Sequence, residues 1–199
     1  MVEIPTQNGC AGKTDEILAE ESKTDERAYA CLMERYEKKL ARYVRRIGVF
    51  TDEDVEEILQ ETFIKTYENI EDFDANLKFS SWIYRIAHNE AVSRIRRDAS
   101  RRTLSQTEFD ELAEQVADEL VLEEEVDKSI VSGEIRSIIA AMDPKYRDVL
   151  VLRFLEHKDY GEISDILKKP IGTVATLLNR AKKIFEKEAK KNPVLSSSI

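Results

Sequence analysis

The sequence of 199 residues has few residues that interrupt helices, with only 6 glycines and 4 prolines. Sandwiches, barrels and Gly-rich α/β folds need such residues at many closely spaced turns, so this scarcity argues against them. Long apolar runs are also missing. None approaches the ~18 residues of a membrane-spanning helix, so we expect no membrane insertion. The first 23 residues have neither a basic start nor an apolar core, so we expect no secretory signal.

Residues that ligate metals or perform acid–base catalysis are scarce too. There are 2 cysteines and 2 histidines, and Cys10 and Cys31 lack the CxxC spacing of a zinc site. They predict no disulfide framework, so we expect a cytoplasmic protein with both thiols reduced. The sequence also lacks a Gly-rich phosphate loop, a nucleophile elbow and a cluster of paired carboxylates. We therefore expect no cofactor, no bound metal and no enzymatic activity.

Charge, by contrast, is abundant and unevenly distributed. Charged residues make up 36% of the chain and the net charge is −9, which excludes a uniformly basic nucleic-acid binder but allows a local basic surface. Residues 101–133 carry 10 acidic and 3 basic groups, whereas residues 134–199 carry 9 acidic and 13 basic groups. The acidic stretch is poor in aromatics, as a linker is. The pattern indicates two small folded units joined by an acidic linker.

Apolar residues of the first unit recur at steps of three and four, which is typical of amphipathic helices. The pattern predicts helices over residues 29–47, 51–67 and 80–97, with Gly48 as a stop after the first. The second helix begins at a capping box opened by Thr51 and has an acidic outer face. Its expected apolar stripe consists of Val55, Ile58, Leu59, Phe63, Ile64 and Tyr67.

The second unit carries the most specific pattern. Asp143 and Pro144 start one helix, and a short helix over 160–167 is followed by a longer one that Pro170 opens. Short helix, tight turn and longer helix together predict a helix-turn-helix. The alternative, an exposed lysine-rich helix that binds no DNA, stays open on pattern alone. The basic residues available to neutralise phosphates are Lys168, Lys169, Arg180, Lys182, Lys183, Lys187, Lys190 and Lys191.

Both units resemble the extracytoplasmic-function (ECF) sigma factors of bacterial RNA polymerase. The family's polymerase-binding helix is similar to residues 55–67 (VEEILQETFIKTY). Its promoter-melting and minus-ten helix is similar to residues 79–97 (FSSWIYRIAHNEAVSRIRR), and its helix-turn-helix for the minus-thirty-five element to residues 159–183 (DYGEISDILKKPIGTVATLLNRAKK). Three such stretches in the right order, with an acidic linker between them, carry the resemblance.

The expected fold is all-α, with two small helical domains joined by an acidic linker, the C-terminal one a helix-turn-helix. The expected divisions are an N-terminal tail at 1–25, a sigma region 2-like domain at 26–100, the linker at 101–133, a sigma region 4-like domain at 134–191 and a C-terminal tail at 192–199.

The resemblance implies that the 55–67 helix docks on the clamp helices of the polymerase's largest subunit. Its polar residues would meet a basic partner, while Ile58, Leu59 and Phe63 pack inward or into the joint. A solvated acidic face is the alternative. The residues implied in polymerase binding are Asp54, Glu56, Glu57, Ile58, Leu59, Gln60, Glu61 and Phe63.

The resemblance also places capture of an extruded minus-ten base at the loop over 73–81 and the helix after it. Trp82 fits the core stripe and is assigned to the core, whereas Tyr84 offers an aromatic face on which bases stack for ~1–3 kcal/mol each. Ordinary loop polarity is the alternative for the first three of the implied contacts. These contacts are Asn76, Lys78, Ser80, Tyr84, Arg85, Asn89, Arg96 and Arg97.

For the minus-thirty-five element, the family's base-facing positions fall on Ala175, Thr176, Asn179 and Arg180, and phosphate contacts on Thr173, Lys182 and Lys183. Asn179 is suited to adenine and Arg180 to guanine. The family's turn usually has glycine where Lys168 stands, so a left-handed conformation there would strain this chain by ~1 kcal/mol.

The expected function is that of a sigma factor that binds core RNA polymerase, recognises both promoter elements, assists DNA melting and so directs promoter-specific transcription initiation. The resemblance further implies an anti-sigma factor as a partner. Two alternatives stay open: a two-domain helix-turn-helix regulator that does not engage core polymerase, and a helical adaptor that binds only proteins.

Overall fold

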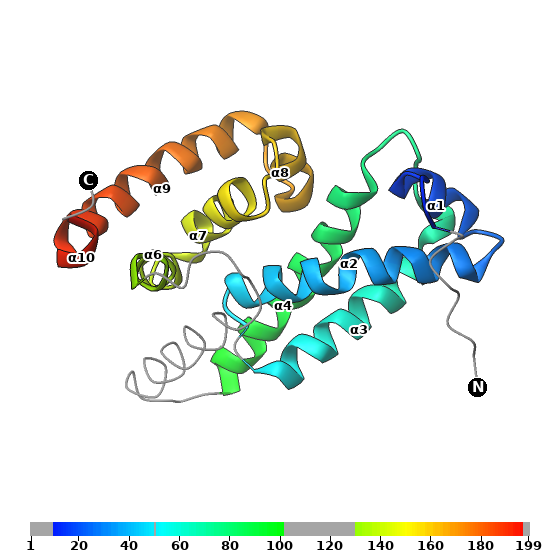
Figure 1. The fold of residues 1–199 in the computed structure, drawn as a ribbon, viewed down its shortest axis with the longest axis horizontal. Helices are drawn as coiled ribbons and strands as arrows, with labels where there is room; N and C mark the ends of the chain where they lie inside the picture. The colour runs from blue at the N-terminus through cyan, green and yellow to red at the C-terminus, as the bar shows by residue number, and fades with distance from the viewer. Residues whose placement is uncertain (1–9, 50, 102–129, 197–199) are drawn as a thin grey trace.

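The computed structural model of the chain describes residues 10–49, 51–101 and 130–196. Every regular element within these ranges is helical, which confirms the all-α prediction. The helices form an N-terminal and a C-terminal group (Figure 1). Within the described residues, no helix is both long and apolar enough to cross a membrane.

The N-terminal group is a bundle of three long helices with a short helix at one end. It comprises α1 (Asp15–Glu21), α2 (Glu26–Arg46), α3 (Asp52–Glu68), the 3₁₀ turn η2 (Ile70–Asp72) and α4 (Phe79–Arg101). The Oγ1 of Thr51 accepts a hydrogen bond from the Asp54 N–H at 3.1 Å, so the predicted cap of α3 is present. Gly48 follows α2 with a φ of 108°, which glycine adopts freely.

The expected N-terminal tail is partly folded into this bundle. Helix α1 buries Leu18 and Ala19. The carboxylate of Asp15 accepts hydrogen bonds from the Tyr36 hydroxyl at 2.6 Å and the Arg35 guanidinium at 2.7 Å. Residues 15–21 therefore belong to the N-terminal core. A helix of 7 residues is too short for a clear periodic pattern, which is why the sequence did not reveal it.

The expectation of two reduced thiols is wrong, because Cys10 and Cys31 form a disulfide. The segment before α1 returns along α2, which brings the two Cα atoms within 5.8 Å, inside the usual range for a disulfide. This pairing depends on the chain reversal around α1. Cysteine spacing alone does not contain that information.

The C-terminal group contains the predicted helix-turn-helix. It comprises α6 (Ile130–Ala140), α7 (Pro144–Leu150), the π-helical turn η3 (Val151–Leu155), α8 (Tyr160–Leu167), α9 (Ile171–Lys191) and α10 (Pro193–Ser196). Asp143 caps α7, and Asp159 and Glu162 form a capping box on α8 that its D-x-x-E spacing could have revealed. Lys168 adopts the left-handed conformation, with φ 52° and ψ 46°, for which the expected strain is ~1 kcal/mol.

The boundaries expected for the acidic linker and for the C-terminal tail differ from those in the structure. Helix α6 begins at Ile130, inside the stretch assigned to the linker, and residues 102–129 of that stretch lie outside the described residues. The expected C-terminal tail contains α10, which contacts α6 and α9 and buries Leu195. Its first residues are therefore packed against the C-terminal group.

The two groups touch each other chiefly where α8 lies on α4. Arg147 also reaches the N-terminal group, since a Cβ on Gly48 would lie 3.2 Å from its Nη1 atom. His88 of α4 faces Asp148 of α7, with 4.0 Å between Nε2 and Oδ2. The first half of α4 is consequently covered on one side by the C-terminal group.

Candidate functional site

Helix α3 presents an acidic stripe to the outside. Glu56, Glu57, Gln60 and Glu61 are exposed, and we call these four residues the α3 stripe. The expected apolar members, Ile58, Leu59 and Phe63, are buried in the core of the bundle and support the helix from behind. Asp54 is mostly buried and pairs with Arg94 of α4, which also pairs with Glu57.

Two apolar residues extend this exposed face beyond the stripe. Ile64 is 44% exposed and Tyr67 is 43% exposed, so their assignment to the buried side of the helix is wrong. Both continue the steps of three and four that run from Gln60, and that spacing could have placed them correctly. The acidic stripe thus ends in a small apolar patch.

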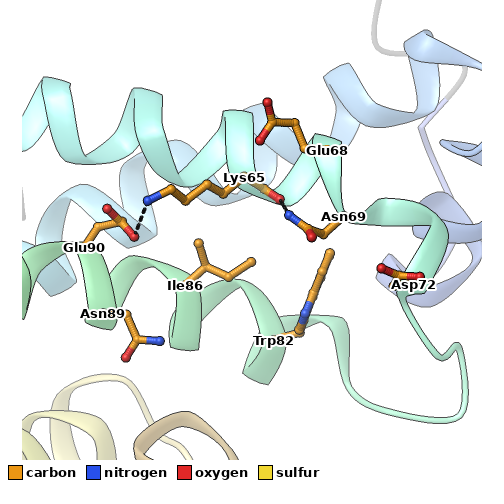
Figure 2. A pocket seen from close by; sticks show the side chains of 8 residues that line it. All are labelled: Lys65, Glu68, Asn69, Asp72, Trp82, Ile86, Asn89 and Glu90. Carbon is orange, nitrogen blue, oxygen red and sulfur yellow. Dashed lines mark hydrogen bonds and ion pairs between the residues drawn. The ribbon is translucent and has the colours of Figure 1, made fainter.

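A groove of about 510 Å³ lies between the end of α3 and the first half of α4 (Figure 2). Trp82 and Ile86 supply its apolar wall. The Lys65 ammonium pairs with Glu90 at 2.8 Å across it, and the side-chain amide of Asn69 donates to the Lys65 carbonyl at 2.7 Å. The residues that line the groove are Lys65, Glu68, Asn69, Asp72, Trp82, Ile86, Asn89 and Glu90.

Trp82 serves both as core and as groove wall. Its ring packs against Phe73 at 5.1 Å and Phe79 at 5.7 Å, measured between ring centroids, yet it is only half-buried. Asn89 is exposed, and within the described part of the chain its amide makes no hydrogen bond. An aromatic face and a free amide therefore lie on the same side of α4.

The loop before α4 is held by its own polar residues. The Oδ1 atom of Asp74 accepts hydrogen bonds from the Asn76 backbone at 2.9 Å and side chain at 2.8 Å, and these bonds hold the pKa of Asp74 below its usual value. Leu77 is 58% exposed.

The predicted minus-ten residues fall on different faces of α4. Asn89 opens onto the groove, and Arg96 and Arg97 are exposed farther along the helix. Arg85 is half-buried. Lys78, Ser80 and Tyr84 instead meet the C-terminal group, and Tyr84 is only 3% exposed. In this arrangement Tyr84 has no free aromatic face for a base.

Helix α9 presents the predicted recognition residues along one ridge. Val174, Leu178 and Ala181 are buried, which fixes the opposite face outward. The exposed residues of the ridge are Thr173, Thr176, Asn179, Arg180, Lys182 and Lys183, with Ala175 half-buried beside them. The Thr176 hydroxyl donates to the Gly172 carbonyl at 2.9 Å, and the Lys182 ammonium lies 5.3 Å from the centre of the Phe154 ring.

Comparison with known proteins decides the family. Residues 32–102 match Sigma-70 region 2 and residues 132–184 match Sigma-70, region 4. The chain is 34% identical over 171 residues to the ECF RNA polymerase sigma factor SigW of Bacillus subtilis, covering 83% of this chain and 91% of that protein. This chain belongs to the ECF sigma factors.

Further relatives and solved structures agree with this assignment. The ECF sigma-E factor of Escherichia coli K12 is 32% identical over 180 residues, covering 87% of this chain and 93% of that protein. The fold is also that of CnrH, solved in complex with the cytosolic domain of CnrY, with a TM-score of 0.65 over 89% of this chain and 98% of that chain at 24% identity. The sigma factor RpoE of Bartonella quintana, solved with the anti-sigma factor NepR, gives 0.59 over 78% and 92% at 15% identity.

Family membership confirms the predicted function. This sigma factor binds core RNA polymerase and directs transcription initiation from promoters. Family membership therefore favours the sigma-factor prediction over the two alternatives, a regulator that does not engage polymerase and an adaptor that binds only proteins.

Proposed function

We propose that three exposed surfaces of this sigma factor divide its work. The α3 stripe with its apolar patch binds core polymerase, the groove beside α4 takes an unstacked base of the minus-ten element, and the ridge on α9 reads the minus-thirty-five element. Each assignment is supported by the chemistry of the side chains exposed there.

The α3 stripe suits a basic protein partner. Three carboxylates and one amide are exposed on one face, and Ile64 and Tyr67 add apolar area at its end. Exposed charge pairs contribute little to affinity by themselves but orient the encounter, whereas apolar and aromatic anchors supply most of the binding energy. The clamp helices of the polymerase's largest subunit are the proposed partner.

The observation that carries the minus-ten assignment is that the free amide of Asn89 lines the same groove as the ring of Trp82, about two helical turns away on α4. Unpaired bases are typically bound by stacking on aromatic side chains and by hydrogen bonds to their edges. Arg96 and Arg97 are exposed farther along α4, and in this proposal they contact phosphates of the same strand.

The ridge on α9 presents hydrogen-bonding groups that can distinguish base pairs in a major groove. Asn179 and Arg180 are exposed next to each other, and Thr176 lies one turn earlier on the same face. Thr173, Lys182 and Lys183 flank them and supply phosphate contacts. The cation–π contact between Lys182 and Phe154 holds one of these lysines at the edge of the ridge.

In-vitro transcription with core polymerase on a random promoter library tests the three assignments together. Glu61→Lys should weaken core binding, because it reverses one charge of the α3 stripe. Asn89→Ala should lower open-complex formation without changing core binding. Arg180→Ala should cost ~1–3 kcal/mol and relax the preference at one base pair.

The control for these variants is Glu188→Gln, which removes a charge at the far end of α9 where Glu188 pairs only with Lys191 in the described structure. It should leave core binding, open-complex formation and base preference unchanged. An Asn89→Ala protein that opens promoters as well as the parent protein contradicts the groove assignment.

We also propose a protein inhibitor as a partner, acting in the cytoplasm. The support is the likeness to the sigma factor RpoE, which was solved with the anti-sigma factor NepR. Co-purification of the full chain from its own cells, followed by mass spectrometry, tests this, and absence of any stoichiometric partner in both inducing and resting cells contradicts it.

A further inference from the structure

Acidic side chains of the C-terminal group cover Lys78, which directly precedes α4, and the face of α4 that carries Ser80 and Tyr84. They come from the end of η3 and the first turn of α8, and each contacts a residue of the N-terminal group. These side chains are Glu156, Asp159 and Glu162, and we call them the acidic latch.

Glu156 is the most buried member of the latch. Its side chain is 5% exposed. Its Oε1 accepts a hydrogen bond from Arg46 at 2.7 Å, and its Oε2 accepts one from the Tyr84 hydroxyl at 2.7 Å. A buried carboxylate without partners costs several kcal/mol, so Glu156 depends on contacts that exist only while the two groups are together.

Asp159 and Glu162 extend the latch onto the start of α4. The Lys78 ammonium lies 3.1 Å from Asp159 and 3.4 Å from Glu162, and the Ser80 hydroxyl donates to Glu162 at 3.3 Å. Lys158, between the latch residues, places its ammonium 4.5 Å from the centre of the Tyr84 ring. One edge and one face of the minus-ten surface are thereby occupied.

These contacts are polar, so the latch can open. Buried apolar residues of the two groups also form one continuous cluster, but interfaces between domains of one chain commonly resemble transient protein–protein interfaces, for which relative domain motion is the default. The α3 stripe, the groove at Asn89 and the α9 ridge all stay exposed. The latch consequently covers the part of the proposed minus-ten surface that carries Lys78, Ser80 and Tyr84 and leaves the groove at Asn89 accessible.

We propose that the acidic latch is an autoinhibitory contact, in which its carboxylates occupy three groups at the start of α4 and just before it, Lys78, Ser80 and Tyr84, that bind single-stranded minus-ten DNA. Carboxylate and phosphate oxygens accept hydrogen bonds from the same cationic and hydroxyl donors. DNA therefore competes with the latch for Lys78, Ser80 and Tyr84. This inference rests on the proposed minus-ten role of α4.

Glu156→Gln in the full chain tests the latch, because it keeps the shape of the side chain and removes its charge. Small-angle X-ray scattering reports the radius of gyration, and fluorescence anisotropy reports affinity for a labelled pool of random 12-nucleotide single strands. We expect a larger radius of gyration and a roughly threefold to tenfold gain in affinity, as a population shift of this size allows. Glu188→Gln, the matched loss of one charge, should change neither.

Arg46→Gln opens the latch from the other side and should reproduce both effects, which guards against a folding defect specific to Glu156→Gln. Circular dichroism confirms that each variant is helical. The inference is overturned if both variants stay as compact as the parent protein, or if they expand without binding the single strands more tightly.

Asn89→Ala separates this inference from the proposed function. If the latch variants fail as described while Asn89→Ala still impairs open-complex formation with core polymerase, the latch is wrong and the minus-ten assignment stands. If Asn89→Ala has no effect on open complexes, the minus-ten assignment itself fails. In the Glu156→Gln background, Asn89→Ala should reverse the gain in single-strand affinity.

Discussion

At the scale of single residues, the contact between the groups contains a buried histidine and a buried aspartate with opposite titration. Burial lowers the pKa of His88 to about 4, assisted by Lys169, Arg147 and Arg96. Burial raises the pKa of Asp148 to about 6, against the opposing effect of Arg147. The Tyr43 hydroxyl is hydrogen bonded to Nδ1 of His88 at 2.9 Å, which holds the ring in place.

These two pKa shifts oppose each other between about pH 4 and 6.5. A raised Asp148 pKa contributes stability below the unfolded value of 3.8 that is lost as pH rises through about 6. A lowered His88 pKa contributes stability above the unfolded value of 6.5 that is lost as pH falls through about 4. The parent protein should therefore show a shallow pH dependence from these two residues.

Replacing either residue should expose the titration of the other. Between pH 4 and pH 6, the free energy of unfolding of His88→Gln should fall by about 2 kcal/mol relative to that of the parent protein. Asp148→Asn should do the reverse, and losses on acidification should appear below pH 6.5. Urea unfolding at several pH values measures both, and parallel pH profiles for parent and variants contradict the assignment.

At the scale of elements, the long helices could be predicted because each has an apolar stripe of several turns and a recognisable start or stop. The helix boundaries predicted from Gly48, Thr51 and Asp143 agree with those of the structure within one or two residues. Helix α1 and the disulfide could not be predicted, because both depend on a chain reversal that brings distant segments together. Ile64 and Tyr67 were assigned to the wrong face because they lie at the border between the apolar and polar faces of α3. Apolar character alone does not show on which side of that border a residue lies.

The disulfide and α1 act as one element, and their loss can be measured. Cys10→Ser removes the link that closes a loop across 21 positions, for which the chain-entropy account gives about 3 kcal/mol. We expect a lower thermal midpoint for Cys10→Ser. Reductant should lower the midpoint of the parent protein by a similar amount and leave the variant unchanged. A parent protein whose midpoint does not respond to reductant contradicts the pairing.

Loss of α1 should also destabilise the junction between the loop over 73–81 and α4. Glu16 of α1 accepts a hydrogen bond from the Phe79 N–H at 3.2 Å, at the first residue of α4. The N-terminus of a helix leaves such N–H groups without partners in the helix itself. The segment before α2 therefore stabilises the start of the helix that carries the proposed base site.

At the scale of the whole molecule, the net charge and the contact between the two groups both weaken DNA binding by the free protein. The chain carries a net charge of −9, which repels DNA, while the basic α9 ridge alone attracts it. The α8–α4 contact in addition covers Lys78, Ser80 and Tyr84. The free sigma factor should therefore bind promoter DNA weakly, and core polymerase should supply both the positive charge and the separation of the two groups.

This predicts how the latch variant behaves in the holoenzyme. Free parent protein should bind a promoter fragment at least about tenfold more weakly than holoenzyme does, equivalent to about 1.4 kcal/mol. Glu156→Gln should reduce this difference in affinity, because it should raise the promoter affinity of the free protein only. In the holoenzyme, polymerase has already separated the two groups. Anisotropy titrations of the same fragment with free protein and with holoenzyme measure all four affinities. Equal affinities of free parent protein and holoenzyme contradict the charge argument, and an equal gain for Glu156→Gln in both forms means that polymerase binding does not open the latch.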